Sequence, residues 1–286
     1  MKIIVIGSQG QLGREVLKQF DKNCYDITEV DKNELNIAVL DDVVSMVRTI
    51  KPDVVINCAA YTNVDACESD FDTAFKVNAI GPRNLSIAAK EVNAKIVHIS
   101  TDYVFDGKGV LKDGRIRPYV EYDSAHPQTA YGKTKLEGEN FVKLFNDKHF
   151  IIRTAWLYGE GKNFVRTMLD LSQKKDVFLK VVNDQRGTPT STEELTGMIK
   201  YLIHTDNYGL FHGTCEGQCT WYEFTKEIFR IKGITTEVIP CTTQEYPRPA
   251  PRPAYSVLEN YMLKLTSNYM FRDWREALEI YLRKQN

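Results

Sequence analysis

The sequence predicts an α/β fold, with a doubly wound parallel sheet followed by a smaller C-terminal α/β lobe. Three observations favour this fold class. Apolar strand-like runs alternate with helix-like runs through the first half of the 286-residue chain, a glycine-rich loop follows the first run, and the alternation loosens beyond about residue 157. Near-continuous apolar strands separated by helices are typical of a parallel sheet that is covered on both faces.

The first half alternates regularly between the two kinds of element. One helix is expected at residues 40–50, where Val43, Val44 and Val47 share a stripe and Pro52 marks the exit. The other helices are expected at residues 11–20, 69–78, 82–92 and 130–145. Strands are expected at residues 2–7, 25–30, 54–58, 96–100 and 150–154.

The second half mixes helices with short strands and stiff loops. Helices are expected at residues 164–172, 192–204, 221–231 and 274–283, and strands at 177–182, 209–213 and 237–240. The segments 187–189 and 247–253 contain prolines that restrict the backbone, so each is either a plain linker or a loop that holds substrate. We expect a dinucleotide-binding Rossmann-like domain over residues 1–157 and a mostly substrate-binding lobe over residues 158–286. Whether segments of the lobe return to the first sheet stays open.

The composition is that of an ordinary soluble globular protein. Hydrophobic residues make up 43% and charged residues 26%, and 37 basic residues nearly balance 38 acidic ones. This balance supplies no bulk electrostatic attraction to nucleic acid or to an anionic membrane. No apolar run approaches the roughly 20 residues of a membrane helix, and the apolar stretch at residues 3–6 is too short for a signal peptide. A cytoplasmic protein without nucleic-acid or membrane partners is expected.

The six cysteines are scattered and form no Cys-x-x-Cys pair. Cys215 and Cys219 near His212 allow a metal-ligand interpretation, but reduced cytoplasmic thiols fit the spacing better. We therefore expect no metal site.

A glycine-rich turn lies between the first strand and the first helix. Gly7, Gly10 and Gly13 have the spacing G-x-x-G-x-x-G rather than the G-x-G-x-x-G of the dinucleotide fingerprint. A plain turn also needs glycine, but the strand–turn–helix setting favours backbone amides that approach a pyrophosphate.

The second and third strands end in residues suited to the adenosine half of a dinucleotide. Asp31 follows Gly13 at the distance where an acid commonly binds a ribose hydroxyl, whereas the adjacent Lys32 could pair with a 2′-phosphate. The choice between NADPH and NADH as cofactor therefore stays open. Cys58, Ala59 and Ala60 offer small side chains beside which the adenosine could lie.

Tyr131 and Lys135 are four residues apart, which on a helix puts a phenol and an ammonium on one face. A phenol of pKa about 10 is a poor acid–base catalyst near neutral pH, and a neighbouring cation lowers that pKa. Thr101 ends the fourth strand, so its hydroxyl should lie with Tyr131 at the carboxyl edge of the sheet. The pattern indicates hydride transfer with a nicotinamide cofactor.

Other polar residues near this strand have simpler interpretations. Thr101 and Asp102 could instead cap a turn, and His98 is expected in the core. Asp106 and Asp123 are expected to be loop acids without a fixed mutual geometry.

Several long motifs resemble the extended short-chain dehydrogenase/reductase family, and the similarity runs from residue 1 to about residue 280. They are the glycine loop at 7–13, Ala59-Ala60-Tyr61-Thr62-x-Val64-Asp65, the segments 100–107, 131–135 and 153–159, Asp184-Gln185-x-Gly187-x-Pro189-Thr190, and Arg252-Pro253-x-x-Ser256-x-Leu258. The resemblance implies NADPH- or NADH-dependent reduction of the 4-keto group of dTDP-4-dehydro-L-rhamnose to dTDP-L-rhamnose, for cell-surface polysaccharide synthesis.

The resemblance also implies roles for individual residues. Tyr131 would donate the proton, Lys135 would bind the nicotinamide ribose and lower the pKa of the tyrosine, and Thr101 would orient the keto oxygen. The dinucleotide would be surrounded by Gly7, Gly10, Gln11, Leu12, Gly13, Asp31, Asn36, Cys58, Ala59, Ala60, Tyr131 and Lys135. The dTDP-sugar would be contacted by Thr101, Asp102, Tyr103, Trp156, Asn163, Arg186 and Arg252.

Three places depart from the family pattern. Cys58 begins a stretch that is usually all alanine, Asn36 stands where relatives often have an acid, and residues 107–118 resemble an insertion. A homodimer is a further expectation from the resemblance.

Two other functions remain as alternatives. A nucleotide-sugar epimerase or dehydratase would need a tightly retained cofactor, and dehydration would need an extra acid/base pair that residues 101–106 lack. A non-catalytic regulatory subunit is the second alternative, because relatives of this reductase bind methionine adenosyltransferase, but Thr101, Tyr131 and Lys135 are intact.

Overall fold

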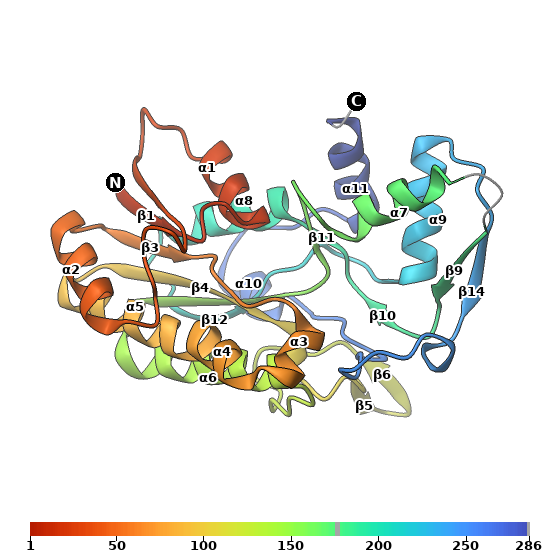
Figure 1. Ribbon diagram of the computed structural model, residues 1–286, viewed down its shortest axis with the longest axis horizontal. Helices are drawn as coiled ribbons and strands as arrows, with labels where there is room; N and C mark the ends of the chain where they lie inside the picture. Colours follow the sequence, from red (N-terminus) through yellow and green to blue (C-terminus); the bar gives the residue numbers. More distant parts are fainter. Residues whose placement is uncertain (175–177, 285–286) are drawn as a thin grey trace.

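A six-stranded parallel sheet forms the centre of the protein in the computed structural model, which describes residues 1–174 and 178–284. From one edge to the other the strand order is β12-β7-β4-β3-β1-β2 (Figure 1). The order reverses between β1 and β3, which is where open α/β sheets bind ligands beyond the carboxyl ends of their strands. The strands are β1 (Lys2–Ile6), β2 (Asp26–Val30), β3 (Val54–Asn57), β4 (Lys95–Thr101), β7 (His149–Thr154) and β12 (Gly209–His212). The predicted doubly wound fold is confirmed.

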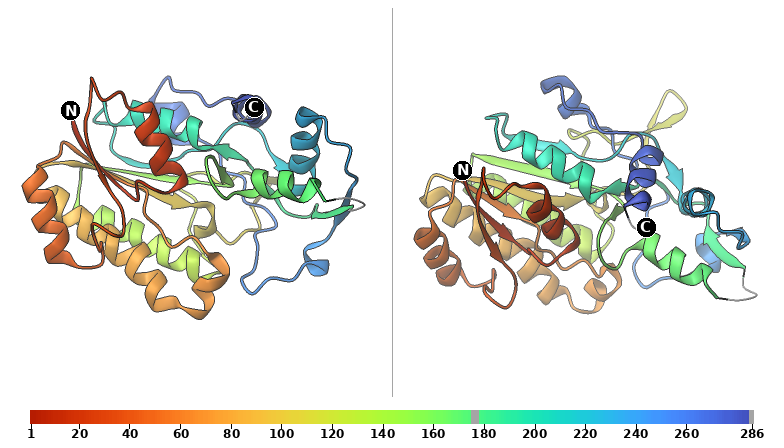
Figure 2. Two further views of the ribbon diagram at one scale, coloured as in Figure 1. Left: turned by 45° about the horizontal axis from the view of Figure 1, so that its top comes forward. Right: turned by 90° about the horizontal axis from the view of Figure 1, so that it is seen from above.

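Helices cover both faces of the sheet (Figure 2). Because side chains alternate along a strand, Ile3 and Val5 pack on one core and Ile4 and Ile6 on the other. The first core is shared with α1 (Gln11–Gln19) and α8 (Thr192–Leu202). The second is shared with α2 (Leu40–Ile50), α5 (Gly81–Glu91) and α6 (Ala130–Phe145). Burial on both faces explains why these strands read as unbroken apolar runs.

The segment between β3 and β4 differs from the single helix predicted at residues 69–78. The chain forms α3 (Val64–Ser69) and α4 (Phe71–Phe75), then a π-helical turn η1 (Lys76–Ile80) that leads into α5. Asn63 and Asp70 cap α3 and α4 by accepting hydrogen bonds from the Ala66 and Thr73 amides. The cap at Asp70 agrees with the predicted start at residue 69, but α3 was not predicted, and η1 continues the helix into α5 where two separate helices were expected.

The C-terminal lobe packs around its own core. Its helices are α7 (Phe164–Ser172), α9 (Trp221–Lys232) and α11 (Trp274–Arg283). Its strands pair in twos: β9 (Leu179–Val182) with β14 (Val238–Cys241), β10 (Arg186–Gly187) with β13 (Cys219–Thr220), and β8 (Leu157–Tyr158) with β11 (Thr190–Ser191). The four helices predicted beyond residue 157 are present. Val177, the first residue of the strand predicted at 177–182, lies outside the described residues.

Three segments of the second half return to the central sheet. β12 pairs in parallel with β7, and α8 packs on α1 against the first core. Leu263 of α10 (Tyr261–Thr266) is buried in that core as well. The hairpin of β5 (Val110–Lys112) and β6 (Arg115–Arg117) projects from the body of the protein (Figure 1). It occupies the insertion-like region after Asp106.

Candidate active site

A cavity of about 840 Å³ lies at the carboxyl ends of the strands, between the sheet and the C-terminal lobe. It brings together residues predicted from distant parts of the sequence. Those that line it are Gly10, Gln11, Leu12, Cys58, Ala60, Thr101, Asp102, Tyr103, Tyr131, Lys135, Trp156 and Arg252. Both the cofactor set and the substrate set are represented on its wall.

The N-terminus of α1 opens into this cavity. No side chain caps this helix within the described residues, whereas side chains cap α6, α7, α8 and α9. An uncapped helix start leaves amide donors and a partial positive charge for an anion. These features fit the pyrophosphate of a dinucleotide.

Gly7 and Gly13 shape the loop rather than line the cavity. Gly7 has a φ of +77°, and a Cβ there would lie 2.7 Å from the Ala59 amide nitrogen. A Cβ on Gly13 would lie 2.2 Å from the Gly7 carbonyl oxygen. The close approach of helix to loop, and of loop to the end of β3, therefore requires glycine at both positions.

Asp31 lies at the end of β2, and its carboxylate is tied to the glycine loop. Its two oxygens accept hydrogen bonds from the Gln9 amide at 2.9 Å and the Lys32 amide at 2.7 Å. Asn36 accepts a hydrogen bond from the Ala38 amide in a nearby turn. Neither side chain lines the cavity, so their contacts with a ribose stay predictions.

Tyr131 and Lys135 lie on the first turns of α6 and both reach the cavity. Thr129 caps the helix by accepting from the Gly132 amide at 3.0 Å. The Lys135 ammonium donates to the Ile99 carbonyl oxygen of β4 at 2.5 Å. Thr101, at the end of β4, hydrogen bonds to the Tyr131 phenol. The predicted triad is therefore assembled on one wall.

Burial is the largest influence on the pKa values of Tyr131 and Lys135. It raises the pKa of Tyr131 above its ordinary value, and the Thr101 hydrogen bond offsets this only in part. Burial also lowers the pKa of Lys135 to about 8, against the attraction of Glu139. The expected lowering of the tyrosine pKa by Lys135 is thus not found, because burial of the phenol outweighs it and the ammonium contacts a backbone carbonyl. Tyr131 is a protonated phenol at neutral pH.

A buried polar network supports the wall from behind. Glu139 accepts two hydrogen bonds from Arg153, at 2.9 and 2.8 Å, and one from the Ser100 hydroxyl at 2.6 Å. His98 is fully buried against Asn57, and burial lowers its pKa well below the ordinary value. It is a neutral core histidine, as the sequence indicated.

The segment after β4 forms a short 3₁₀ turn, η2 (Asp102–Val104), at the cavity. Thr101 donates to the Asp102 carboxylate at 2.9 Å and accepts from the Tyr103 amide at 3.2 Å. Burial raises the pKa of Asp102 to about 6, although hydrogen bonds from Thr101 and Ser256 oppose the shift. Thr101 and Asp102 therefore form a turn and line the cavity as well, so the two interpretations of these residues are compatible.

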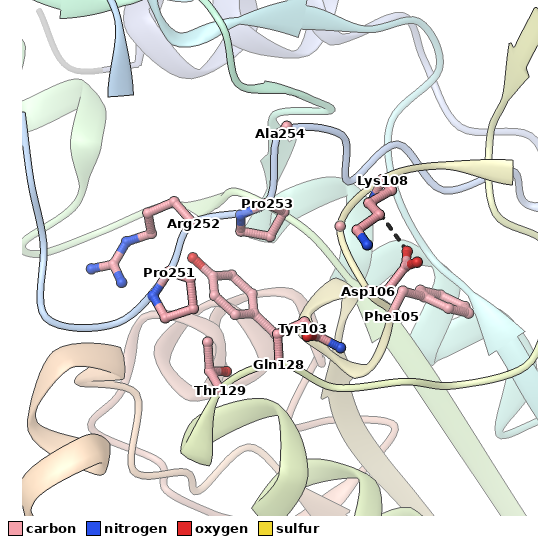
Figure 3. Close-up of a pocket in the computed structure, with 11 residues that line it drawn as sticks. Tyr103, Phe105, Asp106, Lys108, Gln128, Thr129, Pro251, Arg252, Pro253 and Ala254 are labelled. Carbon is pink, nitrogen blue, oxygen red and sulfur yellow. Dashed lines mark hydrogen bonds between the residues drawn. The ribbon is translucent and has the colours of Figure 1, made fainter. Parts of the chain in front are cut away.

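Tyr103 separates the main cavity from a smaller one of about 210 Å³. Its ring meets the Tyr131 ring edge-on, with 5.6 Å between centroids. Figure 3 shows its hydroxyl directed toward the segment that carries Pro251, Arg252 and Pro253. This proline-rich loop is therefore part of the cavity wall and not a plain linker.

Trp156 follows β7 and lies between the sheet and the lobe. Its ring stacks on Trp221, with centroids 3.5 Å apart and planes 7° apart, and it lines the cavity. A Cβ on Gly187 would lie 2.4 Å from the indole. The backbone φ of Trp156 is +46°, a region that costs a non-glycine residue free energy. Packing between the lobes holds this conformation.

Two residues of the predicted substrate set have structural partners away from the cavity wall. Asn163 caps α7 by accepting from the Arg166 amide, and it donates to the Gly159 carbonyl at 2.6 Å. Arg186 on β10 lies 3.8 Å from the Glu223 carboxylate. Their contacts with substrate stay predictions.

The cavity also has wall residues that the sequence did not single out. A group from the C-terminal lobe combines basic and aromatic side chains: Phe164, Lys180, Trp221, Tyr246 and Arg248. The restricted loop at residues 247–253 was the available signal for Arg248, whereas Lys180 on β9 had none.

Among the described residues, no group of three or more His, Cys, Asp or Glu side chains is placed to hold a metal ion. Cys215 and Cys219 are buried in the core of the lobe, and the His212 ring contacts the Glu259 carbonyl. In the same part of the chain, no helix has the length and apolar character needed to cross a membrane.

Comparisons with known proteins agree with this geometry. The family model described as RmlD substrate binding domain matches residues 1–286. The dTDP-4-dehydrorhamnose reductase structure from Clostridium acetobutylicum is 53% identical and superposes with a TM-score of 0.96, covering 100% of this chain and 99% of that one. The Bacillus anthracis reductase in complex with NADP is 41% identical, with a TM-score of 0.94 and 99% of each chain covered.

A curated relative points to the same family. The spore coat polysaccharide biosynthesis protein SpsK of Bacillus subtilis is 41% identical over 287 residues, covering 100% of this chain and 98% of that protein. With a family match over its whole length, and with the tyrosine, lysine and threonine gathered at an uncapped helix N-terminus, the chain belongs to the dTDP-4-dehydrorhamnose reductase family.

Proposed function

We propose that the protein reduces the 4-keto group of dTDP-4-dehydro-L-rhamnose to give dTDP-L-rhamnose, with NADPH or NADH as cofactor. The observation that carries this proposal is the meeting of Thr101, Tyr131 and Lys135 on one cavity wall beside the open start of α1. The names of its relatives, one of them a reductase bound to NADP, support the same activity.

The chain's own residues account for cofactor binding. The amides of Gly10, Gln11 and Leu12 receive the pyrophosphate, and Asp31 faces the adenosine ribose. Lys135 binds the nicotinamide ribose from α6. When bound, the cofactor supplies the hydride that reduces the carbonyl carbon.

The proton comes from Tyr131. Burial keeps its phenol protonated at neutral pH, so it can donate to the carbonyl oxygen as that oxygen gains negative charge. The Thr101 hydroxyl turns its proton from the Asp102 carboxylate to the same oxygen and holds it in place. Lys135 stabilises the phenolate that remains until solvent returns the proton. The phenol therefore starts with the proton that reduction requires, although the raised pKa of Tyr131 makes it a weaker acid than an exposed tyrosine.

Substrate recognition is divided between the two halves. Asp102, Tyr103, Trp156 and Arg252 line the sugar side of the cavity. Residues 1–157 mainly hold the dinucleotide, and residues 158–286 mainly hold the sugar nucleotide, apart from the segments that complete the sheet. Asn163 and Arg186 contact the sugar nucleotide from the lobe.

The proposal extends to the setting of the enzyme. The nearly balanced charge and the six free cysteines support a cytoplasmic protein without a nucleic-acid partner. A homodimer is the expected assembly, and light scattering of the purified chain tests it.

Turnover of dTDP-4-dehydro-L-rhamnose with each nicotinamide cofactor tests the activity, followed by loss of nicotinamide absorbance and identification of the sugar product. Stoichiometric oxidation of cofactor is expected. Product formation without net cofactor oxidation would instead identify an epimerase or dehydratase. Cofactor binding without any turnover would favour the regulatory subunit.

A further inference from the structure

Helix α3 carries two acidic side chains that contact different parts of the active site. Asp65 accepts a hydrogen bond from the Ala250 amide at 3.1 Å and pairs with the Arg252 guanidinium at 2.8 Å. Glu68, three residues later, accepts from the Ala130 amide at the start of α6 at 2.9 Å. The helix therefore joins the proline-rich loop to the helix that carries Tyr131 and Lys135.

The contacts of Asp65 fix both the loop backbone and a cavity side chain. Arg252 lines the cavity, and its second guanidinium nitrogen donates to the Ala250 carbonyl at 3.0 Å. Asp65 and Arg252 side chains are only 26% and 21% exposed, so water screens their pair less than a surface pair. Burial pushes the pKa of Asp65 upward, but the Ala250 amide and Arg252 outweigh it, and the pKa lies below the ordinary value. Asp65 is a carboxylate at neutral pH.

Tyr103 completes the connection between the loop and the reacting groups. It lines both cavities together with Arg252, and its ring contacts Tyr131. Figure 3 shows Arg252 extending from the loop beside Pro251, with the Tyr103 hydroxyl directed at the same segment. A shift of the loop would therefore move Arg252 relative to the cavity wall that contains Tyr131.

We propose that Asp65 is a positioning residue for the sugar nucleotide, which it controls through Arg252; this inference rests on the proposed function. Asp65 holds the guanidinium in the orientation that receives the anionic part of the ligand. Glu68 fixes the position of α3, and therefore of Asp65, relative to α6. Without the carboxylate, the long arginine side chain loses its fixed orientation, so binding weakens while the proton-donating groups stay in place.

The test measures binding of dTDP by calorimetry, in the presence of NADPH, for Asp65→Asn, Arg252→Gln and the double variant. Asp65→Asn is expected to raise the Kd for dTDP about tenfold, and Arg252→Gln at least as much. The double variant should bind no more than about twofold more weakly than Arg252→Gln, because the carboxylate acts only through the guanidinium. In turnover, the KM for the sugar nucleotide should rise in Asp65→Asn while kcat changes less than about threefold.

Asp72→Asn is the matched control, since it makes the same change on the neighbouring exposed turn of α4. Its Kd for dTDP, and the Kd for NADPH in every variant, should equal the wild-type values. If Asp65→Asn does not fold, Asp65→Ser keeps an acceptor for the Ala250 amide without the charge and is measured instead.

A wild-type Kd for dTDP in the neutral Asp65 variant overturns the proposal, as does a wild-type Kd in Arg252→Gln. The proposal is also overturned if the Kd for dTDP in the double variant rises by the product of the two single increases, because Asp65 would then act independently of Arg252. Wild-type protein that binds dTDP but reduces no keto sugar would disprove the proposed function alone, and the Kd values would still decide the role of Asp65. Absence of dTDP binding by the wild type would overturn both.

Discussion

The two walls of the active-site cavity are built in different ways. The wall formed by β4 and α6 consists of long regular elements, and its polar groups are held by the buried network of Glu139, Arg153 and Ser100. The opposite wall combines the nine-residue helix α7, the four-residue strand β9, the loop at residues 247–253 and the stacked pair of Trp156 and Trp221. The first wall suits proton transfer, which requires rigid geometry. The second suits a sugar nucleotide, which must enter and leave.

The same difference predicts how variants on each wall should behave. A change on the α6 wall should lower kcat without changing binding, whereas a change on the lobe wall should act on KM and on stability together. Four experiments test whether the two walls differ in this way.

The largest effect is expected for Tyr131→Phe, which keeps the ring but removes the proton. The kcat should fall by about 100-fold or more, with the Kd for NADPH nearly unchanged. Steady-state kinetics and a fluorescence titration with NADPH measure the two quantities. Turnover close to wild type would remove Tyr131 from the mechanism.

Trp156→Ala is the corresponding change on the lobe wall. The KM for the sugar nucleotide should rise about tenfold, and the melting temperature should fall by about 5 °C because the stack on Trp221 is lost. Calorimetric melting and steady-state kinetics provide both values. An unaltered KM with a lower melting temperature would limit Trp156 to packing between the lobes.

The pH dependence of kcat/KM tests the two buried titrating groups of the site, the base Lys135 and the acid Asp102. Lys135 has a pKa lowered to about 8 by burial, so its positive charge is present below pH 8 and is lost as the pH rises through that value. Asp102 has a pKa raised to about 6 by burial, so its carboxylate is present above pH 6 and is lost as the pH falls. The value of kcat/KM should therefore be greatest between about pH 6 and 8 and fall up to tenfold per unit outside that range. In Asp102→Asn the acidic limb should disappear and the alkaline limb should stay; an acidic limb that persists would belong to another group.

The smallest effect is expected at the cofactor end. Because Asp31 and Lys32 have opposite charges, NADH and NADPH should support turnover with kcat/KM values within about tenfold of each other. Asp31→Asn keeps an acceptor for the Gln9 amide but removes the charge that repels a 2′-phosphate, so preference should move toward NADPH, more at low salt than at high salt. Assays with both cofactors at two ionic strengths measure the ratio. An unchanged ratio would show that Asp31 does not face the ribose.

The α6 wall could be predicted from sequence because its signals are local. The helix was expected at residues 130–145 and has those bounds, since Thr129 caps it and Tyr131 and Lys135 are one turn apart on a single face. The parallel strands could also be predicted from their apolar runs. The glycine loop was found at the correct turn, although Gly7 and Gly13 serve the turn itself and Gly10 lines the cavity.

The lobe wall could not be predicted in the same way because its contacts join residues that are distant in sequence. The pair of Asp65 and Arg252 spans 187 residues, and the stacked rings of Trp156 and Trp221 come from segments that no local pattern connects. The six-residue helix α3 was not predicted because it is too short to show a clear period, and the π-helical turn η1 joins α4 to α5 where a break was expected.

The position of β12 at the edge of the sheet also bears on how the chain folds during synthesis. The residues of β7 are synthesised at positions 149–154, yet the strand that pairs with its outer edge is not synthesised until residues 209–212. Until then β7 is an open edge with unpaired backbone groups, which is a template for pairing with other chains. A fragment that stops at residue 157 would keep that edge permanently and lose the α8 side of one core, so it should aggregate although it holds the whole glycine loop. The nucleotide-binding half is thus completed only after much of the other half has been made.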